Sequence, residues 1–471
     1  MKKKFYITTP IYYINDVPHV GHAYTTIAAD VLSRYYQSKG EDVFFLTGVD
    51  EHGAKIAQAA KKAGLEPKAF ADSLVPRFQE AWRNLNINYS EFFRTTNPVH
   101  EEIVKDFILQ LKDKGFVEKK KYSGLYCTAC EKFLLPDELS DGCCPDHGTK
   151  PEEHSEENYF FLLSKFGDKL SKAIEAGDYE ILPESRKNEV LGKIKNGLDD
   201  VSISREKVEW GIPFPGDESQ TIYVWIDALI NYWSAQKVFD QENIWPADIH
   251  LMAKDILWFH AIIWPAMLMA LDLPLPKKVF AHGFFTVGGQ KMSKTRGNVL
   301  DPNALVEKFG ADAVRYALLR EFPFGEDGDI SEEKIAARYQ SELSNGLGNL
   351  LQRTISMINK YDIDVKSQNS RPKADQPMAE KSLKLIEELK FDQALQEIAS
   401  EITKLNQYIE ENKPWELAKT DQSKLAEVLT HVHAGLVDIS PQVAPFMPET
   451  AEKMKKQLET LEPEALFPRL S

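Results

Sequence analysis

The first 64 residues alternate between segments typical of strands and segments typical of helices. Residues 5–13 and 42–47 are rich in apolar, β-branched and aromatic residues, as in strands of a sheet. Residues 21–38 and 54–63 carry apolar side chains at helical spacing, and Gly64 is a typical stop for the second helix. This order predicts an α/β fold with a Rossmann-like, doubly wound parallel sheet.

The 471-residue chain is too long for a single core, and the pattern of strand-like and helix-like segments changes along the sequence. The alternation stops near residue 115, returns with a strand-like run at 221–226, and is replaced by long Ala/Leu/Lys/Glu segments after 331. We expect five parts: residues 1–115, the first half of the Rossmann-like domain; 116–220, a connective insertion; 221–290, the second half; 291–335, a loop and stem-contact region; and 336–471, an all-α helical bundle.

The charge balance and the apolar runs exclude two classes of protein. With 57 Lys and Arg against 72 Asp and Glu, the net charge is −15, which argues against a general nucleic-acid coat protein but permits a local basic patch. The longest apolar run, 256–271, contains His260 and Pro265 and is too short to span a bilayer. The N-terminus lacks a signal-peptide pattern, so we expect a cytoplasmic protein with no membrane partner.

A pair of histidines, His19 and His22, encloses Gly21 between the first predicted strand and helix. Imidazoles at the positive end of a helix can donate hydrogen bonds to phosphate oxygens. A glycine lets a nucleotide pack directly on the backbone. The motif therefore indicates an ATP site; the alternative is two capping or core histidines around a turn glycine.

A second motif, Lys291-Met292-Ser293-Lys294-Thr295, follows the Gly288-Gly289 turn. Two ammonium groups three residues apart on a mobile loop can hold a triphosphate and stabilise the charge of a departing pyrophosphate. On its own such a pair is more typical of a solvated basic loop. Its presence in the same chain as the histidine motif favours ATP chemistry.

All four cysteines lie between residues 127 and 144, in two pairs of potential metal ligands. Cys127 and Cys130 are separated by two residues, and after a 13-residue gap Cys144 and His147 are likewise separated by two residues. Such spacings are typical of a closed tetrahedral Zn²⁺ site, so we expect one structural zinc per chain. Cys143 is the spare thiol and His154 a weaker candidate ligand; the alternative is a turn-rich segment with reduced thiols.

The two nucleotide motifs resemble the HIGH and KMSKS sequences of class I aminoacyl-tRNA synthetases, with Thr295 in place of the last serine. The strings TPIYYIND (9–16), TGVDEHG (47–53), YVWIDA (223–228), AKDILWFH (253–260) and HGF (282–284) resemble methionyl-tRNA synthetases, in order over nearly the whole chain. The resemblance implies ATP-dependent ligation of L-methionine to methionine tRNA through methionyl-adenylate, with release of AMP and pyrophosphate. ATP would enter as its Mg²⁺ complex.

The same resemblance implies roles for individual residues. The implied catalytic residues are His19, His22, Lys291 and Lys294, with Gly21 and the ribose-contacting Asp255 completing the ATP site. The implied methionine-binding residues are Ile11, Tyr13, Asp50, Trp225, Ala228, Leu229, Tyr232 and His260. Aromatic walls suit a soft thioether, and one carboxylate suits a cationic amine. Without the resemblance, core packing would explain the aromatic residues and a helix cap would explain Asp50.

In the predicted bundle, Asn345, Asn349 and Arg353 recur every four residues and would line one helix face. Trp415, after Pro414, could stack on an unpaired base. A solvated face and a tryptophan that anchors the bundle would explain the same residues. The resemblance implies instead that Asn349, Arg353 and Trp415 bind the CAU anticodon of methionine tRNA.

Two other functions are compatible with parts of the pattern. A small-molecule adenylyltransferase can share the histidine motif, although the bundle and the cysteines would then lack an explanation. A catalytically inactive tRNA-binding or regulatory paralogue would not need the intact histidine and lysine pairs. Because the chain stops at Ser471, directly after the predicted bundle, we expect a monomer without the further dimerising domain of many bacterial relatives.

Overall fold

The computed structural model describes residues 4–128, 132–134, 138–145, 148–206, 208–292, 299–365 and 376–470. Two compact units divide the chain. Unit 1 contains Met1–Val17, Leu46–Arg77 and Ser90–Ala281. Unit 2 contains Pro18–Phe45, Phe78–Tyr89 and His282–Ser471.

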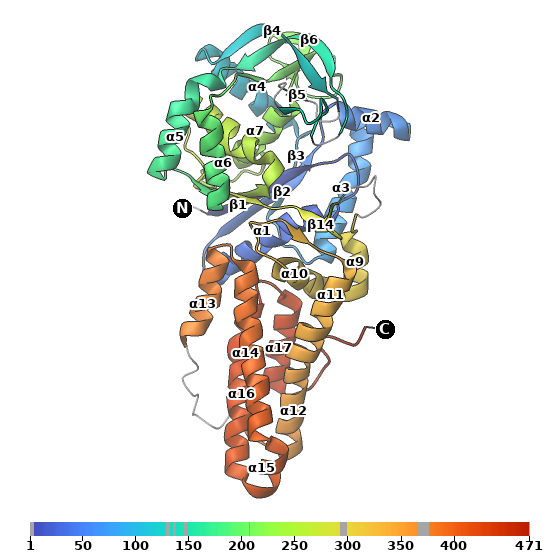
Figure 1. Cartoon of the computed structure of the whole chain (residues 1–471), viewed down its shortest axis with the longest axis vertical. Helices are drawn as coiled ribbons and strands as arrows, with labels where there is room; N and C mark the ends of the chain where they lie inside the picture. The colour runs from blue at the N-terminus through green and yellow to red at the C-terminus, as the bar shows by residue number, and fades with distance from the viewer. Residues whose placement is uncertain are drawn as a thin grey trace. The chain divides into compact units, whose positions relative to one another are not determined.

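A six-stranded sheet carries most of the predicted α/β pattern (Figure 1). From edge to edge its strands are β3 (Glu91–Arg94), β2 (Val43–Asp50), β1 (Phe5–Tyr13), β12 (Ile249–Ala253), β13 (Lys278–His282) and β7 (Glu180–Leu182). The pairs β2–β3, β1–β12 and β13–β7 are parallel, with Ile7 opposite Ile249. All eight residues of β2 and seven of the nine in β1 are buried, as in a parallel sheet that is covered on both faces. The predicted fold class is confirmed.

The helices of unit 1 follow local sequence signals. They are α2 (Ala54–Ala63), the first part of α3 (Pro67–Asn84), α4 (Pro98–Asp113), α5 (Gly167–Ala176), α6 (Glu184–Lys195), α7 (Val224–Val238) and α8 (Trp264–Ala270). Helix α2 ends as predicted, because Gly64 takes the left-handed conformation with φ of 69°. Helix α4 begins after Asn97, whose side chain accepts a hydrogen bond from the N–H of Val99.

Between β3 and β12 the chain forms two small antiparallel sheets and the edge strand β7. One sheet has the order β5 (Lys132–Leu134), β4 (Val117–Cys127), β6 (Glu152–Phe161) and β8 (Val201–Ser202). The other has the order β10 (Pro213–Phe214), β11 (Asp217–Ile222) and β9 (Ser204–Glu206). Strand β7 falls inside the predicted insertion 116–220, yet it pairs with β13 of the main sheet.

The strand predicted at residues 221–226 is wrong in both extent and partner. Strand β11 ends at Ile222, belongs to the small antiparallel sheet, and is followed at Tyr223 by the N-cap of α7. A short apolar run is compatible with a buried strand or a buried helix, and here the helix forms from Val224 onward.

Unit 2 begins with α1 (Val20–Ser38) and continues with a small sheet and two helices after residue 281. The sheet has the order β15 (Gln290–Lys291), β14 (Phe285–Val287) and β16 (Gly328–Asp329), and the helices are α9 (Pro302–Phe309) and α10 (Ala311–Arg320). Arg315 on α10 is fully buried and forms a 2.6 Å ion pair with Asp30 of α1. Its guanidinium also donates to the carbonyls of Leu85, Pro445 and Phe446, so one side chain joins four segments of this unit.

The C-terminal part of unit 2 is the predicted helical bundle. It consists of α11 (Glu332–Arg338), a π-helix (Tyr339–Gly348), α12 (Asn349–Tyr361), α13 (Gln376–Glu387), α14 (Phe391–Asn412), α15 (Pro414–Thr420), α16 (Gln422–Val443) and α17 (Pro448–Thr460). Helices α12, α14 and α16 run side by side (Figure 1). The leucines that indicated the bundle, Leu343, Leu347, Leu350 and Leu351, are all buried. Within the described part of the chain, no helix is long and apolar enough to cross a membrane.

Candidate active site

The carboxyl ends of three neighbouring strands carry predicted site residues. Tyr13 ends β1, Asp50 ends β2, and Asp255 lies in the turn directly after β12. In the sheet order β1 lies between β2 and β12. Ligands of open α/β sheets bind outside the carboxyl ends of the strands, so these three residues are placed where a substrate is expected.

The two histidines of the first motif form the cap of α1. The Nδ1 atom of His19 accepts a hydrogen bond from the N–H of Gly21 at 3.1 Å, and the N–H of His19 donates to Nδ1 of His22 at 3.3 Å. The two rings stack with centroids 3.7 Å apart. The capping role that the sequence left open is therefore present. Because both Nδ1 atoms accept, each neutral ring carries its proton on Nε2, which is a donor suited to a phosphate oxygen at a helix N-terminus.

Met292, inside the second motif, and Leu300, after it, lie close to this turn within unit 2. The N–H of Val20 donates to the carbonyl of Leu300 at 3.0 Å. A Cβ atom placed on Gly21 would lie 3.7 Å from Cε of Met292 and only 3.0 Å from the ring of His19. Segments more than 270 residues apart in the sequence thus meet at the start of α1. The side chain of Lys291 and the whole of residues 293–298, including Lys294, lie outside the described residues.

The methionine-binding candidates on α7 share one helix face. Trp225, Ala228, Leu229 and Tyr232 are spaced by three, one and three residues, which corresponds to one face of an α-helix. Trp225 stacks on Phe259 with ring centroids 4.3 Å apart. Ala228 and Leu229 are buried, as is Ile11 on β1, whereas Tyr13 is half-buried. These candidates therefore come from β1, α7 and the π-helix Phe259–Ile263, all within unit 1.

Tyr232 and His260 form a buried, uncharged pair. The Tyr232 hydroxyl lies 2.8 Å from Nε2 of His260, and the His260 Nδ1 atom lies 3.0 Å from the carbonyl of Ile256. A carbonyl only accepts, so Nδ1 carries the proton and the hydroxyl donates to Nε2. Burial lowers the pKa of His260 to about 4 and raises the pKa of Tyr232, so both are neutral at pH 7. A neutral wall with one polarised hydroxyl suits a thioether.

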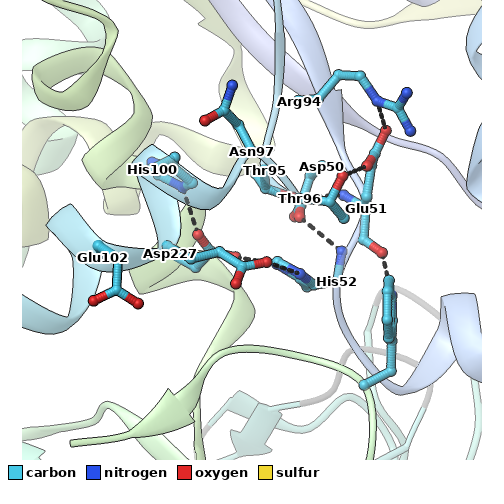
Figure 2. A network of polar contacts seen from close by, with 12 residues as sticks. Asp50, Glu51, His52, Arg94, Thr95, Thr96, Asn97, His100, Glu102 and Asp227 are labelled. Carbon is cyan, nitrogen blue, oxygen red and sulfur yellow. Dashed lines mark hydrogen bonds and ion pairs between the residues drawn. The ribbon is translucent and has the colours of Figure 1, made fainter. Parts of the chain in front are cut away.

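Asp50 lies at the edge of a polar network that the sequence did not predict (Figure 2). Its backbone carbonyl accepts from the N–H of Ile14, and its carboxylate lies 3.4 Å from the N–H of His52. The Nδ1 atom of His52 and Nε2 of His100 each lie 2.7 Å from a different oxygen of Asp227. The available signals were the positions of His52 and Asp227, which lie inside the methionyl-type strings 47–53 and 223–228.

The charges in this network are set by its burial and its hydrogen bonds. Burial alone would raise the pKa of Asp227, but the hydrogen bonds from His100 and His52 lower it below the usual value. Burial alone would lower the pKa of His52, but the hydrogen bond to Asp227 and the nearby carboxylate of Glu101 raise it. Asp227 is therefore an anion that is paired on both of its oxygens.

In the bundle the structure brings two anticodon candidates together. The guanidinium carbon of Arg353 on α12 lies 5.3 Å from the ring of Trp415 on α15, and its Nη1 atom lies 2.6 Å from Glu410. Trp415 is 37% exposed, enough to offer a ring face to a base. Asn349 lies one helical turn before Arg353. Asn345 belongs to the preceding π-helix, whose wider turn interrupts the predicted four-residue face.

Two of the four predicted zinc ligands can be placed. Cys127 and Cys144 are each 1% exposed and share one buried cluster with Leu134. Cys143 is half-buried and pairs through backbone hydrogen bonds with Ser140. The described residues, which do not include Cys130 or His147, contain no group of three potential metal ligands.

Comparisons with known proteins agree with this arrangement. A family model described as tRNA synthetases class I (M) matches residues 5–150 and 134–355, and a model for the anticodon binding domain of methionyl tRNA ligase matches residues 375–468. The methionine–tRNA ligase of Caldanaerobacter subterraneus subsp. tengcongensis is 48% identical, over 97% of this chain and 74% of that protein. The chain belongs to the methionyl-tRNA synthetase family. The ligase of Streptomyces coelicolor is 43% identical, over 96% of this chain and 89% of that protein.

Solved structures of methionyl-tRNA synthetases have the same fold. The Mycobacterium tuberculosis methionyl-tRNA synthetase in complex with methionyl-adenylate superposes with a TM-score of 0.92 at 38% identity, covering 99% of this chain and 100% of that one. The apo form of that synthetase gives a TM-score of 0.83 at 35% identity, covering 100% of this chain and 99% of that one.

Proposed function

We infer that the chain ligates L-methionine to methionine tRNA in two steps, through methionyl-adenylate. The observation that carries this function is the hydrogen bond from the Val20 N–H to the Leu300 carbonyl at 3.0 Å, together with the Met292 side chain beside Gly21. It supports one site in which imidazoles and ammonium groups act on a single triphosphate.

In the first step the methionine carboxylate attacks the α-phosphorus of Mg²⁺-bound ATP and pyrophosphate leaves. His19 and His22 would donate from Nε2 to phosphate oxygens at the N-terminus of α1, as their tautomers allow. Lys291 and Lys294 would stabilise the charge on the departing pyrophosphate. The reaction needs no covalent nucleophile, because positioning and charge stabilisation account for the step. In the second step the terminal ribose 2′-hydroxyl of the tRNA takes the methionyl group, and AMP is released.

Methionine would be held by its two ends. The face of α7 that carries Trp225 and Tyr232, with His260, would contact the thioether side chain. Asp50, at the carboxyl end of β2, would bind the ammonium group, and Asp255, after β12, would contact the ribose of the adenylate. Ile11, Tyr13, Ala228 and Leu229 would complete the walls of this pocket.

The CAU anticodon would be bound by Asn349, Arg353 and Trp415. The cation–π contact between Arg353 and Trp415 supports this assignment, because it holds a planar guanidinium beside an exposed ring in position for stacking. We expect the protein to work as a monomer in the cytoplasm.

We also propose that Cys127, Cys130, Cys144 and His147 hold one structural Zn²⁺. The residues present fit such an ion, because the two described thiols are almost fully buried in one small cluster. A metal with four protein ligands stabilises the local fold and takes no part in the reaction. Metal analysis should find one zinc per chain, which Cys144→Ser loses and Cys143→Ser keeps; protein without zinc would contradict the assignment.

Methionine-dependent exchange of pyrophosphate into ATP tests the proposed function. We expect exchange with methionine and far less with other amino acids, followed by charging of methionine tRNA. A small-molecule adenylyltransferase would show no exchange with methionine. An inactive paralogue would bind tRNA without any exchange.

A further inference from the structure

The carboxylate of Asp227 connects three segments of unit 1 around the candidate methionine site (Figure 2). Asp227 lies in the first turn of α7, and only 2% of its side chain is exposed. One carboxylate oxygen is 2.7 Å from Nδ1 of His52, in the loop that follows β2. The other is 2.7 Å from Nε2 of His100, in the first turn of α4. None of the roles proposed above includes this residue.

Both imidazoles make a second contact on their other side. The Nδ1 atom of His100 lies 2.7 Å from the hydroxyl of Ser234, two turns further along α7. The Nε2 atom of His52 lies 3.7 Å from the carboxylate of Glu101 on α4. His52 therefore lies between two carboxylates, and His100 contacts α7 at two points. Such a network restrains its members, because both oxygens of Asp227 and three of the four imidazole nitrogens lie within hydrogen-bonding distance of a partner.

The residues beside Asp50 are fixed from other directions. Arg94 on β3 donates from Nε to the carboxylate of Glu51 at 2.6 Å, and Thr96 donates to its other oxygen. The backbone carbonyl of Glu51 accepts from the Trp210 indole at 2.5 Å. Glu51 is thus held at its side chain and at its backbone, which limits the movement of Asp50 at the end of β2.

We propose that Asp227 is a positioning residue for methionine recognition: by holding His52, it fixes the Asp50 carboxylate relative to the pocket face of α7. One methionine molecule must reach the carboxylate with its ammonium and α7 with its side chain. Errors of about 1 Å in such a distance can cost roughly 10²-fold in rate. The inference rests on the proposed function, because it names a residue that supports the same site.

Asp227→Asn is the direct test. An amide offers one accepting oxygen and one NH₂ group, so one of the two imidazoles loses its carboxylate partner and must accept from the amide instead, while the side-chain volume is kept. In the exchange assay we expect kcat/KM for methionine to fall at least about 10-fold, with KM for ATP within about two-fold of wild type. If Asp227 only stabilised the fold, Asp227→Asn would lower stability and the amount of active enzyme, but it would not change the kinetic constants for methionine more than those for ATP.

A double-mutant cycle shows whether the effect passes through Asp50. If Asp227 acts by positioning Asp50, Asp227→Asn should change kcat/KM for methionine by less than about two-fold in an Asp50→Asn background. The same fold-loss in both backgrounds would overturn the inference.

Two further variants keep the test decisive. Asp312, a buried carboxylate of unit 2 that accepts from the N–H of Thr450, is the matched control, and Asp312→Asn should leave KM for methionine unchanged. If Asp227→Asn does not fold, His52→Gln should show the same loss for methionine. Wild-type protein without methionine-dependent exchange would refute the proposed function itself. Normal exchange with unchanged kcat/KM in Asp227→Asn or in His52→Gln would refute only the role of Asp227.

Discussion

Gly21 allows the ring of His19 to lie against the backbone at the start of α1. A Cβ atom at this position would be 3.0 Å from both Cε1 and Nδ1 of the ring, closer than an ordinary van der Waals contact. Gly21→Ala therefore displaces the ring by several tenths of an ångström and weakens the 3.1 Å hydrogen bond from the Gly21 N–H. The lost cap costs about 1 kcal/mol of stability. Because the displaced imidazole is also a phosphate donor, we expect kcat for adenylate formation to fall roughly 10- to 100-fold.

The assay is pyrophosphate exchange at saturating methionine and ATP, together with thermal unfolding of the same samples. Gly192→Ala on α6 is the matched control, because an added Cβ there meets no atom within 4 Å. That variant should keep wild-type exchange and gain about 0.5–1 kcal/mol of stability. Exchange by Gly21→Ala within two-fold of wild type would refute the assignment of His19 to the phosphates.

Four other changes test separate parts of the account. Trp415→Ala should leave pyrophosphate exchange intact but lower tRNA charging roughly 5- to 150-fold, which corresponds to the binding free energy of one base stacked on an aromatic ring. An equal loss in both assays would argue against an anticodon role for Trp415. Lys294→Ala should slow adenylate formation while methionine affinity is kept, and unchanged exchange would exclude this lysine from catalysis. Arg315→Leu removes the 2.6 Å ion pair to the buried carboxylate of Asp30, which keeps Arg34 as a partner, and the hydrogen bonds to the carbonyls of Leu85, Pro445 and Phe446, so we expect a loss of about 1–3 kcal/mol in stability; a melting temperature within 2 °C of wild type would contradict this. Burial lowers the pKa of His282 from 6.5 to about 4, so between these pH values the unfolded state binds more protons than the folded state. The free energy of unfolding should therefore decrease as pH falls from 6.5 to 4. In urea unfolding, His282→Gln should reduce this dependence of the free energy of unfolding on pH, and an unaltered dependence would contradict the lowered pKa of His282.

Local patterns predicted those elements whose signals lie within a few residues. The bounds of β1 and α2 agree with the sequence because alternation, helical spacing and a terminal glycine are all local features. The histidine turn was predicted for the same reason, since a cap and a helix start are adjacent in the chain. The meeting of the second motif with this turn was inferred from the presence of both motifs in one chain and from the resemblance to a family, because no local pattern connects residues so far apart.

One local signal was misinterpreted, and features that depend on distant residues were missed. The run at 221–226 was interpreted as a strand from its apolar character, although the spacing of Trp225, Ala228 and Tyr232 indicates a helix. The network around Asp227 joins residues 127 and 175 positions apart, and no pattern in one sequence specifies such pairs. The roles of Lys294, Cys130 and His147 remain predictions, because these residues lie outside the described parts of the chain.

A crystal structure of the protein with methionine and a non-hydrolysable ATP analogue would show whether both motifs bind one nucleotide. We expect Nε2 of His19 and His22 and the ammonium groups of Lys291 and Lys294 all to contact phosphate oxygens of that nucleotide. A nucleotide bound by the histidines while both lysines lie away from its phosphates would contradict this expectation.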